Sequence, residues 1–300
     1  MSTAFLAVVN PAAGGGRCGQ LAGAALKKLQ AAGVELDVRE SHFPGAATAL
    51  VREAYGKGYR RFLAVGGDGT AYEIVNGLFP GAEAGEPSTL AFLPLGTGNS
   101  FLRDFTDRSL DFATEALLAN RRRPCDVVRL THKHGVIHYI NLLSMGFPAD
   151  VAALTNRKFK PLGELGYLLG ILTCLLRLNR RAFPLRLEGD SEIDHRPCLF
   201  LSFNNSKFTG GKMMIAPRAD IADGLIEFVR WGPIGRFGLI RNLHRLYDGS
   251  HMGHRLASRR AARHIEFHLE GPVDVMIDGE VLTLHCETLE VLPAALNVMV

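Results

Sequence analysis

Three glycine-rich turns, each placed directly after a short apolar segment, constrain this sequence more than any other feature. They are 10–17 (NPAAGGGR), 66–70 (GGDGT) and 95–100 (LGTGNS). Around them, strand patterns and helical patterns alternate, as in a parallel, doubly wound sheet. The carboxyl ends of parallel strands meet at one edge of such a sheet, where its ligands bind. The three turns should therefore gather at that edge.

The chain is long enough for two domains, and its patterning changes once along its length. The expected strands of the first region cover 4–9, 34–39, 62–65 and 89–93, and the expected helices cover 20–32, 46–55, 70–78 and 110–120. After Pro124 short strands predominate, at 126–131, 136–144, 184–189, 198–203, 225–231, 264–269, 273–277 and 281–284, with helical stretches near 161–179 and 233–248. This predicts an α/β domain over 1–124 and a β-sandwich over 125–300, whose last strand could return to the first domain.

The turn 66–70 has the composition of a phosphate-binding loop. Its glycines let a phosphate approach the main chain, and the helix that follows adds a positive dipole. Asp68 would repel phosphate unless it contacts a metal or the nucleophile, so its presence favours a nucleotide site with magnesium. A tight turn with a capping Asp is the alternative, and the two other phosphate-compatible turns weaken it. The sequence contains no Walker A loop and no GxGxxG turn in a dinucleotide-binding context.

In this order and spacing, NPAAGG (10–15), GGDGTAYE (66–73) and PLGTGN (94–99) resemble the diacylglycerol kinase catalytic-domain family, which includes bacterial lipid kinases and sphingosine and ceramide kinases. The resemblance continues in NLLSMGF (141–147), in the GG…P.A…DGL segment (210–225) and in DGE (278–280). GGDGT alone also occurs in NAD kinases and phosphofructokinases, whereas the combination is specific to lipid kinases. The family implies a Rossmann-like nucleotide-binding domain joined to a β-sandwich, with the active site in the cleft between them.

The resemblance also implies roles for individual residues. Those matched to the ATP site are Asn10, Ser41, Gly66, Gly67, Asp68, Gly69, Thr70, Gly96, Thr97 and Asn99. Glu280 matches the general base, which accepts the proton of a lipid hydroxyl as the γ-phosphoryl group is transferred, and Asp68 would act near the catalytic Mg²⁺. Asp223, with main-chain oxygens of Asp220 and Leu225, matches a further magnesium site.

Four positions depart from the family's commonest pattern. Ala13 replaces a Ser, the usual Lys of the first loop is missing and Arg17 is the nearest cation, Tyr72 replaces an Asn, and Ser100 replaces an Asp. These changes leave nucleotide contacts and substrate choice open.

The Asp-Gly pairs of the matched motifs also have an ordinary explanation. Asp223-Gly224 and Asp278-Gly279 are each typical of a turn between strands. A hairpin turn can nevertheless present Glu280 to a cleft, so the two interpretations are compatible.

Two stretches carry more positive charge than the whole chain, whose net charge is +4. Residues 157–181 and 241–264 each contain six Lys or Arg against one acidic residue, giving +5. Either they are solvated helix faces, or they contact an anionic partner, which could be a phospholipid surface, nucleic acid or a phosphorylated substrate. No aromatic stacking pattern is interleaved with the arginines of 241–264, which argues against nucleic acid. The leucine stripe 165, 168, 169, 172 and 176, like Trp231, predicts core, although it could also form an amphipathic element that rests on lipid.

Cysteine usage and the apolar segments bear on location. The five cysteines contain no CxxC pair, which fits reduced thiols in the cytoplasm better than disulfides or a zinc site. The N-terminal apolar run lacks the basic flank of a signal peptide, and the stretch 165–178 is too short to span a bilayer. We therefore expect a cytoplasmic protein, with peripheral membrane contact and with a homodimer as a possibility.

Together these features predict an ATP- and Mg²⁺-dependent kinase that phosphorylates a hydroxyl of a lipid such as diacylglycerol. Two alternatives stay open. One is a small-molecule kinase of the NAD kinase type, and the other is a non-catalytic regulator that binds lipid or nucleotide. The sequence does not identify the acceptor lipid.

Overall fold

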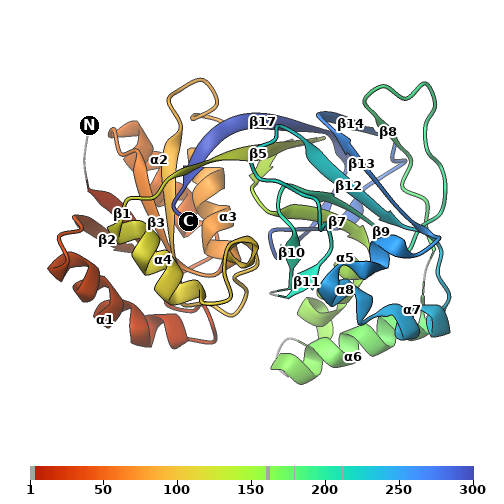
Figure 1. Ribbon diagram of the computed structural model, residues 1–300, viewed down its shortest axis with the longest axis horizontal. Helices are drawn as coiled ribbons and strands as arrows, with labels where there is room; N and C mark the ends of the chain where they lie inside the picture. Colours follow the sequence, from red (N-terminus) through yellow and green to blue (C-terminus); the bar gives the residue numbers. More distant parts are fainter. Residues whose placement is uncertain (1–3, 160–162, 179, 211) are drawn as a thin grey trace.

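The computed structural model describes residues 4–159, 163–178, 180–210 and 212–300. Its first domain is a parallel sheet between helices (Figure 1). The strands are β1 (Phe5–Val9), β2 (Leu36–Glu40), β3 (Arg61–Gly66) and β4 (Ser88–Pro94), in the order β2-β1-β3-β4. The helices are α1 (Arg17–Ala31), α2 (Ala46–Gly56), α3 (Asp68–Leu78) and α4 (Ser109–Leu118), and a 3₁₀ turn, η1 (Phe101–Asp104), follows the third glycine turn.

Both faces of this sheet are covered, which explains why its strands read as continuous apolar runs. Successive residues of β1 point to opposite faces. Phe5 and Val9 pack with α1, whereas Leu6 and Val8 pack with α2 and α3. The predicted doubly wound α/β fold of this region is confirmed.

The second domain is a sandwich of antiparallel strands. One sheet has the order β13-β12-β9-β7-β15-β16, from β13 (Ala257–Ala262), β12 (Ile226–Trp231), β9 (Phe200–Asn204), β7 (Leu142–Gly146), β15 (Val273–Ile277) and β16 (Glu280–Leu284). Facing it are β5 (Arg123–His132), β6 (Gly135–Tyr139), β8 (Leu185–Leu187), β14 (His264–Phe267) and β17 (Cys286–Val298). Tyr139, Phe203 and Phe228 are among the side chains buried between the sheets. The predicted β-sandwich is thus confirmed.

Helices cover the outer face of the six-stranded sheet. They are α5 (Phe147–Leu154), the π-helical η2 (Thr155–Phe159), α6 (Gly163–Leu176), α7 (Arg236–Asn242), α8 (Arg245–Asp248) and η4 (Ser250–Gly253), and a small ribbon, β10 (Phe208–Thr209) with β11 (Met213–Met214), lies beside them. Trp231 of β12 is buried against Leu239 and Leu246 of these helices, as predicted for a core residue. Among the described residues, no helix is both long and apolar enough to cross a membrane.

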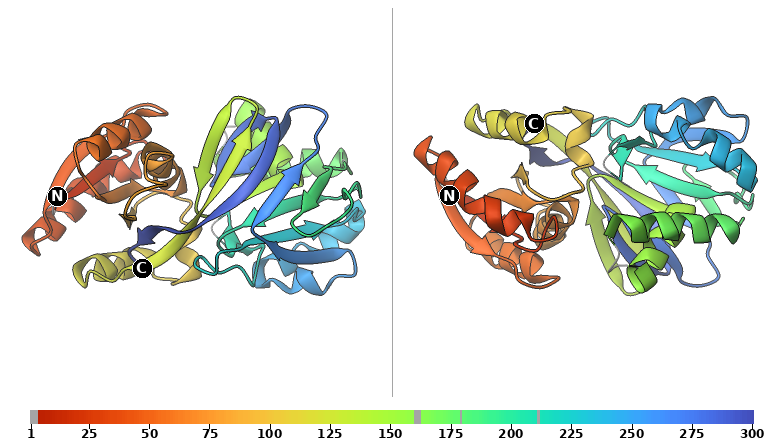
Figure 2. Two further views of the ribbon diagram at one scale, coloured as in Figure 1. Left: turned by 90° about the horizontal axis from the view of Figure 1, so that it is seen from above. Right: turned by 90° about the horizontal axis from the view of Figure 1, so that it is seen from below.

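Strand β17 belongs to both domains (Figures 1 and 2). Most of it pairs antiparallel with β5 and β14 in the sandwich, and its last residues, 296–298, pair in parallel with β4. One nine-stranded sheet therefore runs through the whole molecule.

Three expectations from the sequence need correction. The strand expected at 136–144 divides into β6 and β7, because the intervening main chain turns its N–H groups toward the carboxylate of Asp278. Part of the basic run 241–264 is strand β13, where Arg259 and Arg260 form ion pairs with Glu227 and Asp190. In the leucine stripe, the side chains at 172 and 176 are exposed rather than core.

Lys160 and Gly211 lie outside the described residues, as do the side chains of Leu165 and Leu168.

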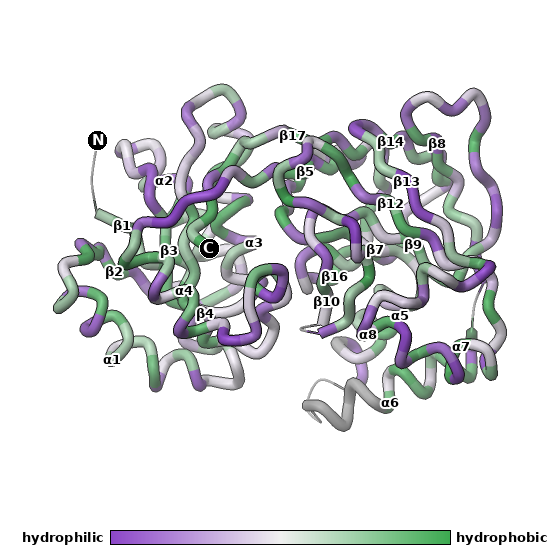
Figure 3. The backbone as a smooth tube through the Cα atoms, viewed as in Figure 1, coloured by the Kyte–Doolittle hydropathy of each residue, from purple (hydrophilic) through white to green (hydrophobic). Residues whose placement is uncertain are grey.

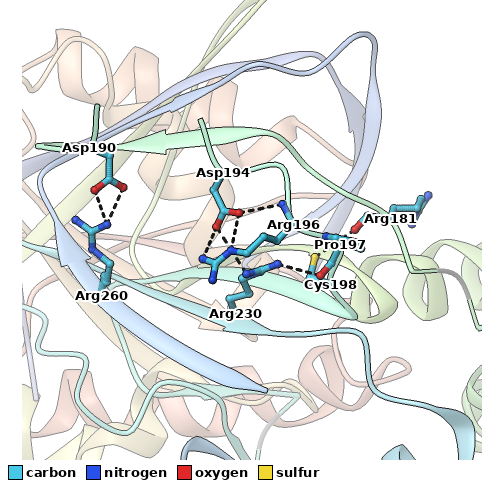
Figure 4. A network of polar contacts seen from close by, with 8 residues as sticks. All are labelled: Arg181, Asp190, Asp194, Arg196, Pro197, Cys198, Arg230 and Arg260. Atoms are coloured by element: carbon cyan, nitrogen blue, oxygen red, sulfur yellow. Dashed lines mark hydrogen bonds and ion pairs between the residues drawn. The ribbon is translucent and has the colours of Figure 1, made fainter. Parts of the chain in front are cut away.

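Ion pairs hold the segment 188–197 against the sandwich (Figure 4). The Asp194 carboxylate accepts hydrogen bonds from Arg196 at 2.7 and 2.8 Å, and it lies 3.7 Å from the buried guanidinium of Arg230. Arg230 also donates to the Pro197 carbonyl, at 2.9 Å. The hydrogen bond from Arg196 is the main cause that lowers the pKa of Asp194 to about 2.

We predict that Asp194→Ala lowers the free energy of unfolding by about 3 kcal/mol, because Arg230 would stay buried without its carboxylate partner. Urea titration at pH 7 measures this. The stabilisation by Asp194 is complete above its unfolded pKa of about 3.9 and is lost as the pH falls toward 2, so the difference between the two proteins should shrink in acid. Asp107→Ala, which removes an exposed ion pair, should cost less than about 1 kcal/mol. An equal decrease in the free energy of unfolding in Asp194→Ala and Asp107→Ala would contradict the prediction.

Candidate active site

The second and third glycine turns touch through their main chains. Gly96 donates its N–H to the Gly66 carbonyl, and Asp68 donates its N–H to the Gly98 carbonyl, each at 2.9 Å. A methyl group on Gly96 would lie 2.7 Å from the nitrogen and Cα of Gly67. Only glycine permits this approach, which brings the carboxyl ends of β3 and β4 to one site, as the sequence predicted.

The first turn and Ser41 lie at the same edge of the sheet. Asn10 donates its N–H to the Val65 carbonyl, at 3.0 Å, and a methyl group on Gly14 would lie 3.0 Å from the Leu95 carbonyl oxygen. The Ser41 hydroxyl donates to the last carbonyl of β1, at 3.3 Å. All three glycine turns and Ser41 are thereby assembled around the ends of four neighbouring strands.

The remaining residues matched to the ATP site differ in exposure. Thr97 is exposed at the tip of the third turn, and Asn99 donates from its side-chain amide to the Gly96 carbonyl at 3.1 Å. The Thr70 hydroxyl is buried, and the described residues provide it with no hydrogen-bond partner. Gly69 lies in the first turn of α3, where its missing side chain leaves space for Glu280.

Asp68 begins α3 with its carboxylate turned toward the third glycine turn. Its oxygens accept N–H bonds from Ser100 at 2.9 Å and from Phe101 at 3.5 Å. Loss of solvation raises the pKa of Asp68 to about 6, although these hydrogen bonds lower it. Because Ser100 stands where an Asp is usual in the resembled family, Asp68 has a neutral donor beside it instead of a second acid.

The DGE turn of the second domain meets α3 of the first. A methyl group on Gly69 would lie 2.8 Å from Oε1 of Glu280, so this carboxylate lies over the first turn of α3. Asp278 is buried in the same turn, with a φ of +46°. Burial is the main cause that raises the pKa of Asp278 to about 7, and the charge of Asp68 raises it further. The structure therefore brings Asp68 and Glu280 together across the domain boundary, as the family resemblance implied.

The contacts of two members of this group were not predicted, although both residues lie in matched motifs, GGDGTAYE (66–73) and DGE (278–280). Asp278 accepts N–H bonds from Ile140, Asn141 and Leu142, at 2.9–3.1 Å, and so fixes the DGE turn to the start of β7. Tyr72, one helical turn after Asp68, has its pKa raised by burial and by the charges of Asp278 and Glu280. The positive φ of an Asp-Gly turn explains why Asp278 was assigned only as a turn residue. We call the carboxylates Asp68, Asp278 and Glu280, beside Tyr72, the carboxylate cluster.

A cavity of about 410 Å³ adjoins the carboxylate cluster. Asp68, Ser100, Asn141 and Asp278 contribute polar groups to its wall. The remaining wall is largely apolar and comes from α5 to α8, β9 and β12, including Val151, Ile171, Phe200, Trp231 and Leu239. An apolar chain could therefore fill this space while a polar group at its end reaches the two carboxylates.

The residues matched to the further magnesium site share one loop before β12. Asp220 and Asp223 each accept an N–H bond from the residue two positions later, at 3.1 and 3.0 Å. Partial loss of solvation and then the charge of Asp220 raise the pKa of Asp223. In the described parts of the chain, no three His, Cys, Asp or Glu side chains are arranged to hold a metal ion, so a cation here would depend on main-chain oxygens such as those of Asp220 and Leu225. Asp223 lines a cavity different from that of Asp68.

Helix α3 is fixed from two sides by residues that follow the GGDGT turn. The Glu73 carboxylate accepts N–H bonds from Gly45 and Ala47, each at 3.0 Å, and so caps α2. The Asn76 side chain exchanges two hydrogen bonds of 2.9 Å with the main chain of His138 in β6. The position of Asp68 and the orientation of its side chain therefore depend on contacts from both domains.

We predict that Asp278→Asn flattens the pH dependence of stability between about pH 4 and pH 7. The folded pKa of about 7 exceeds the unfolded value of about 3.9, so protonation of Asp278 stabilises the folded protein below pH 4, and this contribution is lost as the pH rises through 7. Urea titrations across this range measure it, with Asp274→Asn, on the strand that leads into this turn, as the control. An unchanged slope in Asp278→Asn would show that Asp278 does not titrate in this way.

Known proteins are similar to this chain along nearly all of its length. Residues 4–130 match the diacylglycerol kinase catalytic domain, and residues 141–300 match the YegS C-terminal NAD kinase beta sandwich-like domain. A diacylglycerol kinase of Mycobacterium tuberculosis is 28% identical over 297 residues, which are 98% of this chain and 94% of that protein. A probable lipid kinase YegS-like of Pseudomonas aeruginosa is 33% identical over 281 residues, which are 92% of this chain and 88% of that protein.

The fold is shared with a solved structure. A putative diacylglycerol kinase from Bacillus anthracis superposes with a TM-score of 0.77 and 24% identity, over 99% of this chain and 95% of the other. The sandwich domain alone matches more than half of the chain, and the Pseudomonas relative covers most of both domains. The chain therefore belongs to the diacylglycerol kinase catalytic-domain family, with a YegS-type C-terminal domain.

Proposed function

We propose that this protein transfers the γ-phosphoryl group of ATP to a hydroxyl of a lipid such as diacylglycerol, in a reaction that requires Mg²⁺. The observation that carries the proposal is the largely apolar cavity of about 410 Å³ with Asp68 and Asp278 in its wall. An acyl chain fits such a space better than a soluble nucleotide does, which argues against an acceptor of the NAD type. The names of the relatives point to the same class of acceptor.

Glu280 is the residue we assign as general base. Its carboxylate lies over the first turn of α3, beside the turn proposed to hold the phosphates. A lipid hydroxyl placed between the cavity and this turn could pass its proton to the carboxylate as the oxygen attacks the γ-phosphorus. The phosphoryl group moves to the lipid oxygen, and ADP leaves.

The glycine turns would position the nucleotide. Phosphates would lie along the edge where the three turns meet, at the positive end of the α3 dipole. The residues proposed to contact ATP are Asn10, Ser41, Gly66, Gly67, Asp68, Gly69, Thr70, Gly96, Thr97 and Asn99. The Asp68 N–H is already bonded to the Gly98 carbonyl, so its contribution is the carboxylate rather than the main chain.

Two poorly solvated carboxylates in one cavity fit a divalent cation. Loss of solvation raises the pKa of both Asp68 and Asp278, and a cation beside them would favour their ionised forms. Bound Mg²⁺ would neutralise phosphate charge, and Asp68 is the residue proposed to lie near it. A further ion is proposed on Asp223 with the main-chain oxygens of Asp220 and Leu225.

We also propose a cytoplasmic location with peripheral contact to an anionic membrane. The five cysteines are free thiols in the structure, which supports a reducing compartment, and a lipid substrate requires access to a bilayer. A homodimer stays a prediction from the sequence.

Labelled phosphate from [γ-³²P]ATP is expected to appear in a lipid of a mixed vesicle panel when Mg²⁺ is present, and not with EDTA. Glu280→Gln should reduce kcat/KM by about 10²–10⁴-fold, since it removes the proton acceptor while keeping the side-chain shape. Asp68→Asn should also reduce it strongly. The exposed residue Glu287 provides a matched control, because Glu287→Gln should leave the rate unchanged.

The same assay tests the alternatives. Phosphorylation of NAD without vesicles would favour the NAD kinase type, and ATP binding with no labelled lipid would favour the regulator. Full activity in Glu280→Gln would overturn its role as base.

Saturating Mg²⁺ is expected to raise the unfolding temperature of the wild-type protein more than that of Asp223→Asn. An ion that binds only the folded state stabilises it by mass action, and the variant removes a charged ligand. Differential scanning calorimetry with and without Mg²⁺ measures the shift, with Asp107→Asn as an exposed control. Equal shifts in the wild type and Asp223→Asn would speak against this site.

A further inference from the structure

Exposed apolar side chains are concentrated on the helices that cover the sandwich. Of the twelve large hydrophobic side chains exposed in the described residues, five lie on α6, α7 and α8, and a sixth, Leu243, lies between α7 and α8. They are Leu172, Leu176, Phe237, Ile240, Leu243 and Tyr247, and Phe237 is 89% exposed. We call this surface the α6–α8 face. Soluble proteins seldom leave such a group uncovered unless it binds something.

The helices of this face are held side by side (Figure 1). Arg236 at the start of α7 donates to the Leu176 carbonyl at the end of α6, at 2.6 Å. Figure 3 shows hydrophobic and hydrophilic residues following each other along α7. The hydrogen bond places the end of α6, where Leu176 is exposed, beside the start of α7, where Phe237 is exposed.

Arginines surround these apolar side chains. Arg177, Arg180, Arg236 and Arg241 are exposed, and Arg245 is half-exposed. The acidic residue Asp248 lies at the end of α8, where its carboxylate caps the N–H of Ser250. The face thus combines apolar groups with positive charge. By contrast, Arg259 and Arg260 in the same basic run are paired with carboxylates on the sandwich, away from this face.

The cavity of the proposed active site reaches the surface at the α6–α8 face. Leu243 and Tyr247 line the cavity and are also 37% and 55% exposed. Ile171 and Leu239 continue the lining inward, and Asp68 and Asp278 lie in the same cavity wall. One apolar path therefore leads from this face to the carboxylate cluster.

We propose that the α6–α8 face docks on an anionic phospholipid bilayer, and that an acyl chain enters the cavity directly from it. Exposed Leu, Phe and Ile side chains ringed by arginines are the composition of helices that lie in a membrane interface. Each arginine near an anionic leaflet adds attraction. The entry of an acyl chain rests on the proposed function, whereas the docking on a bilayer does not.

Charge argues for a membrane over a second copy of this chain. In a symmetric dimer through this face, the same five arginines of both copies would be brought together. Their repulsion would oppose association, whereas an anionic bilayer complements both the charge and the apolar groups.

The test is flotation of the full chain with vesicles of phosphatidylcholine alone or mixed with phosphatidylglycerol. Wild type should bind the mixed vesicles, with affinity falling as salt rises. Phe237→Glu and Ile240→Glu should each bind at least about ten-fold more weakly, and Arg241→Gln about five-fold more weakly. Leu118→Glu and Arg108→Gln, exposed on the first domain, should bind as the wild type does.

Activity separates the docking from the proposed function. With a short-chain, water-soluble diacylglycerol and no vesicles, Phe237→Glu should be as active as the wild type, while on mixed vesicles it should lose activity in proportion to binding. The wild type could bind vesicles, and Phe237→Glu fail to bind them, while neither protein phosphorylates any lipid. That result would support the docking proposal and contradict the kinase proposal. Binding that is unchanged in Phe237→Glu and Ile240→Glu would overturn the docking. So would failure of the wild type to bind, or a dimer in sedimentation velocity that Phe237→Glu dissociates.

Discussion

The pairing of β17 with strands of both domains is the constraint on which the rest of the structure depends. Its last residues pair in parallel with β4, and the preceding part forms a long antiparallel ladder with β5. β4 leads directly into the third glycine turn, and β16, which begins with Glu280, immediately precedes β17. Because β17 pairs with β4 and directly follows β16 along the chain, it ties the edge proposed to bind phosphate to the DGE turn of the other sheet. A flexible linker between two domains could not fix their separation in this way.

The pairing of β17 holds together groups that would otherwise separate. Asp68 and Asp278 are poorly solvated carboxylates from different domains, and the charge of Asp68 raises the pKa of Asp278. Such a pair opposes its own assembly. Main-chain N–H bonds to both carboxylates and the Asn76–His138 contact between α3 and β6 offset part of that cost. A site that is electrostatically unfavourable when empty is suited to a cationic or proton-donating ligand, and kinase chemistry involves both.

Local sequence was sufficient for the first domain and for the motifs, because each depends on neighbouring residues. Glycine turns after apolar strands predicted the sheet edge, and the edge formed as expected. The break between β6 and β7 could not be predicted, since it depends on Asp278, which is 136 residues or more away in the sequence. The same distance hid the role of Asp278 itself. Tyr72 was recognised as a departure from the family pattern, but its place beside Asp278 and Glu280 required the fold.

The leucine stripe of α6 shows a different limit of sequence reasoning. Apolar residues at helical spacing predict a buried face, but in the described part of the stripe Leu172 and Leu176 are exposed, and the α6 residue that packs against the buried cluster is Leu175, outside the stripe. Periodicity reports that a face is apolar, and it does not report what covers that face. Here the uncovered part adjoins α7 and the mouth of the cavity, on the second domain, whereas the glycine turns lie on the first. A substrate that enters at this mouth would therefore meet the carboxylate cluster with its polar end, and the nucleotide would approach from the other domain. This arrangement suits an amphiphile, whose apolar part stays near the bilayer while its hydroxyl is phosphorylated.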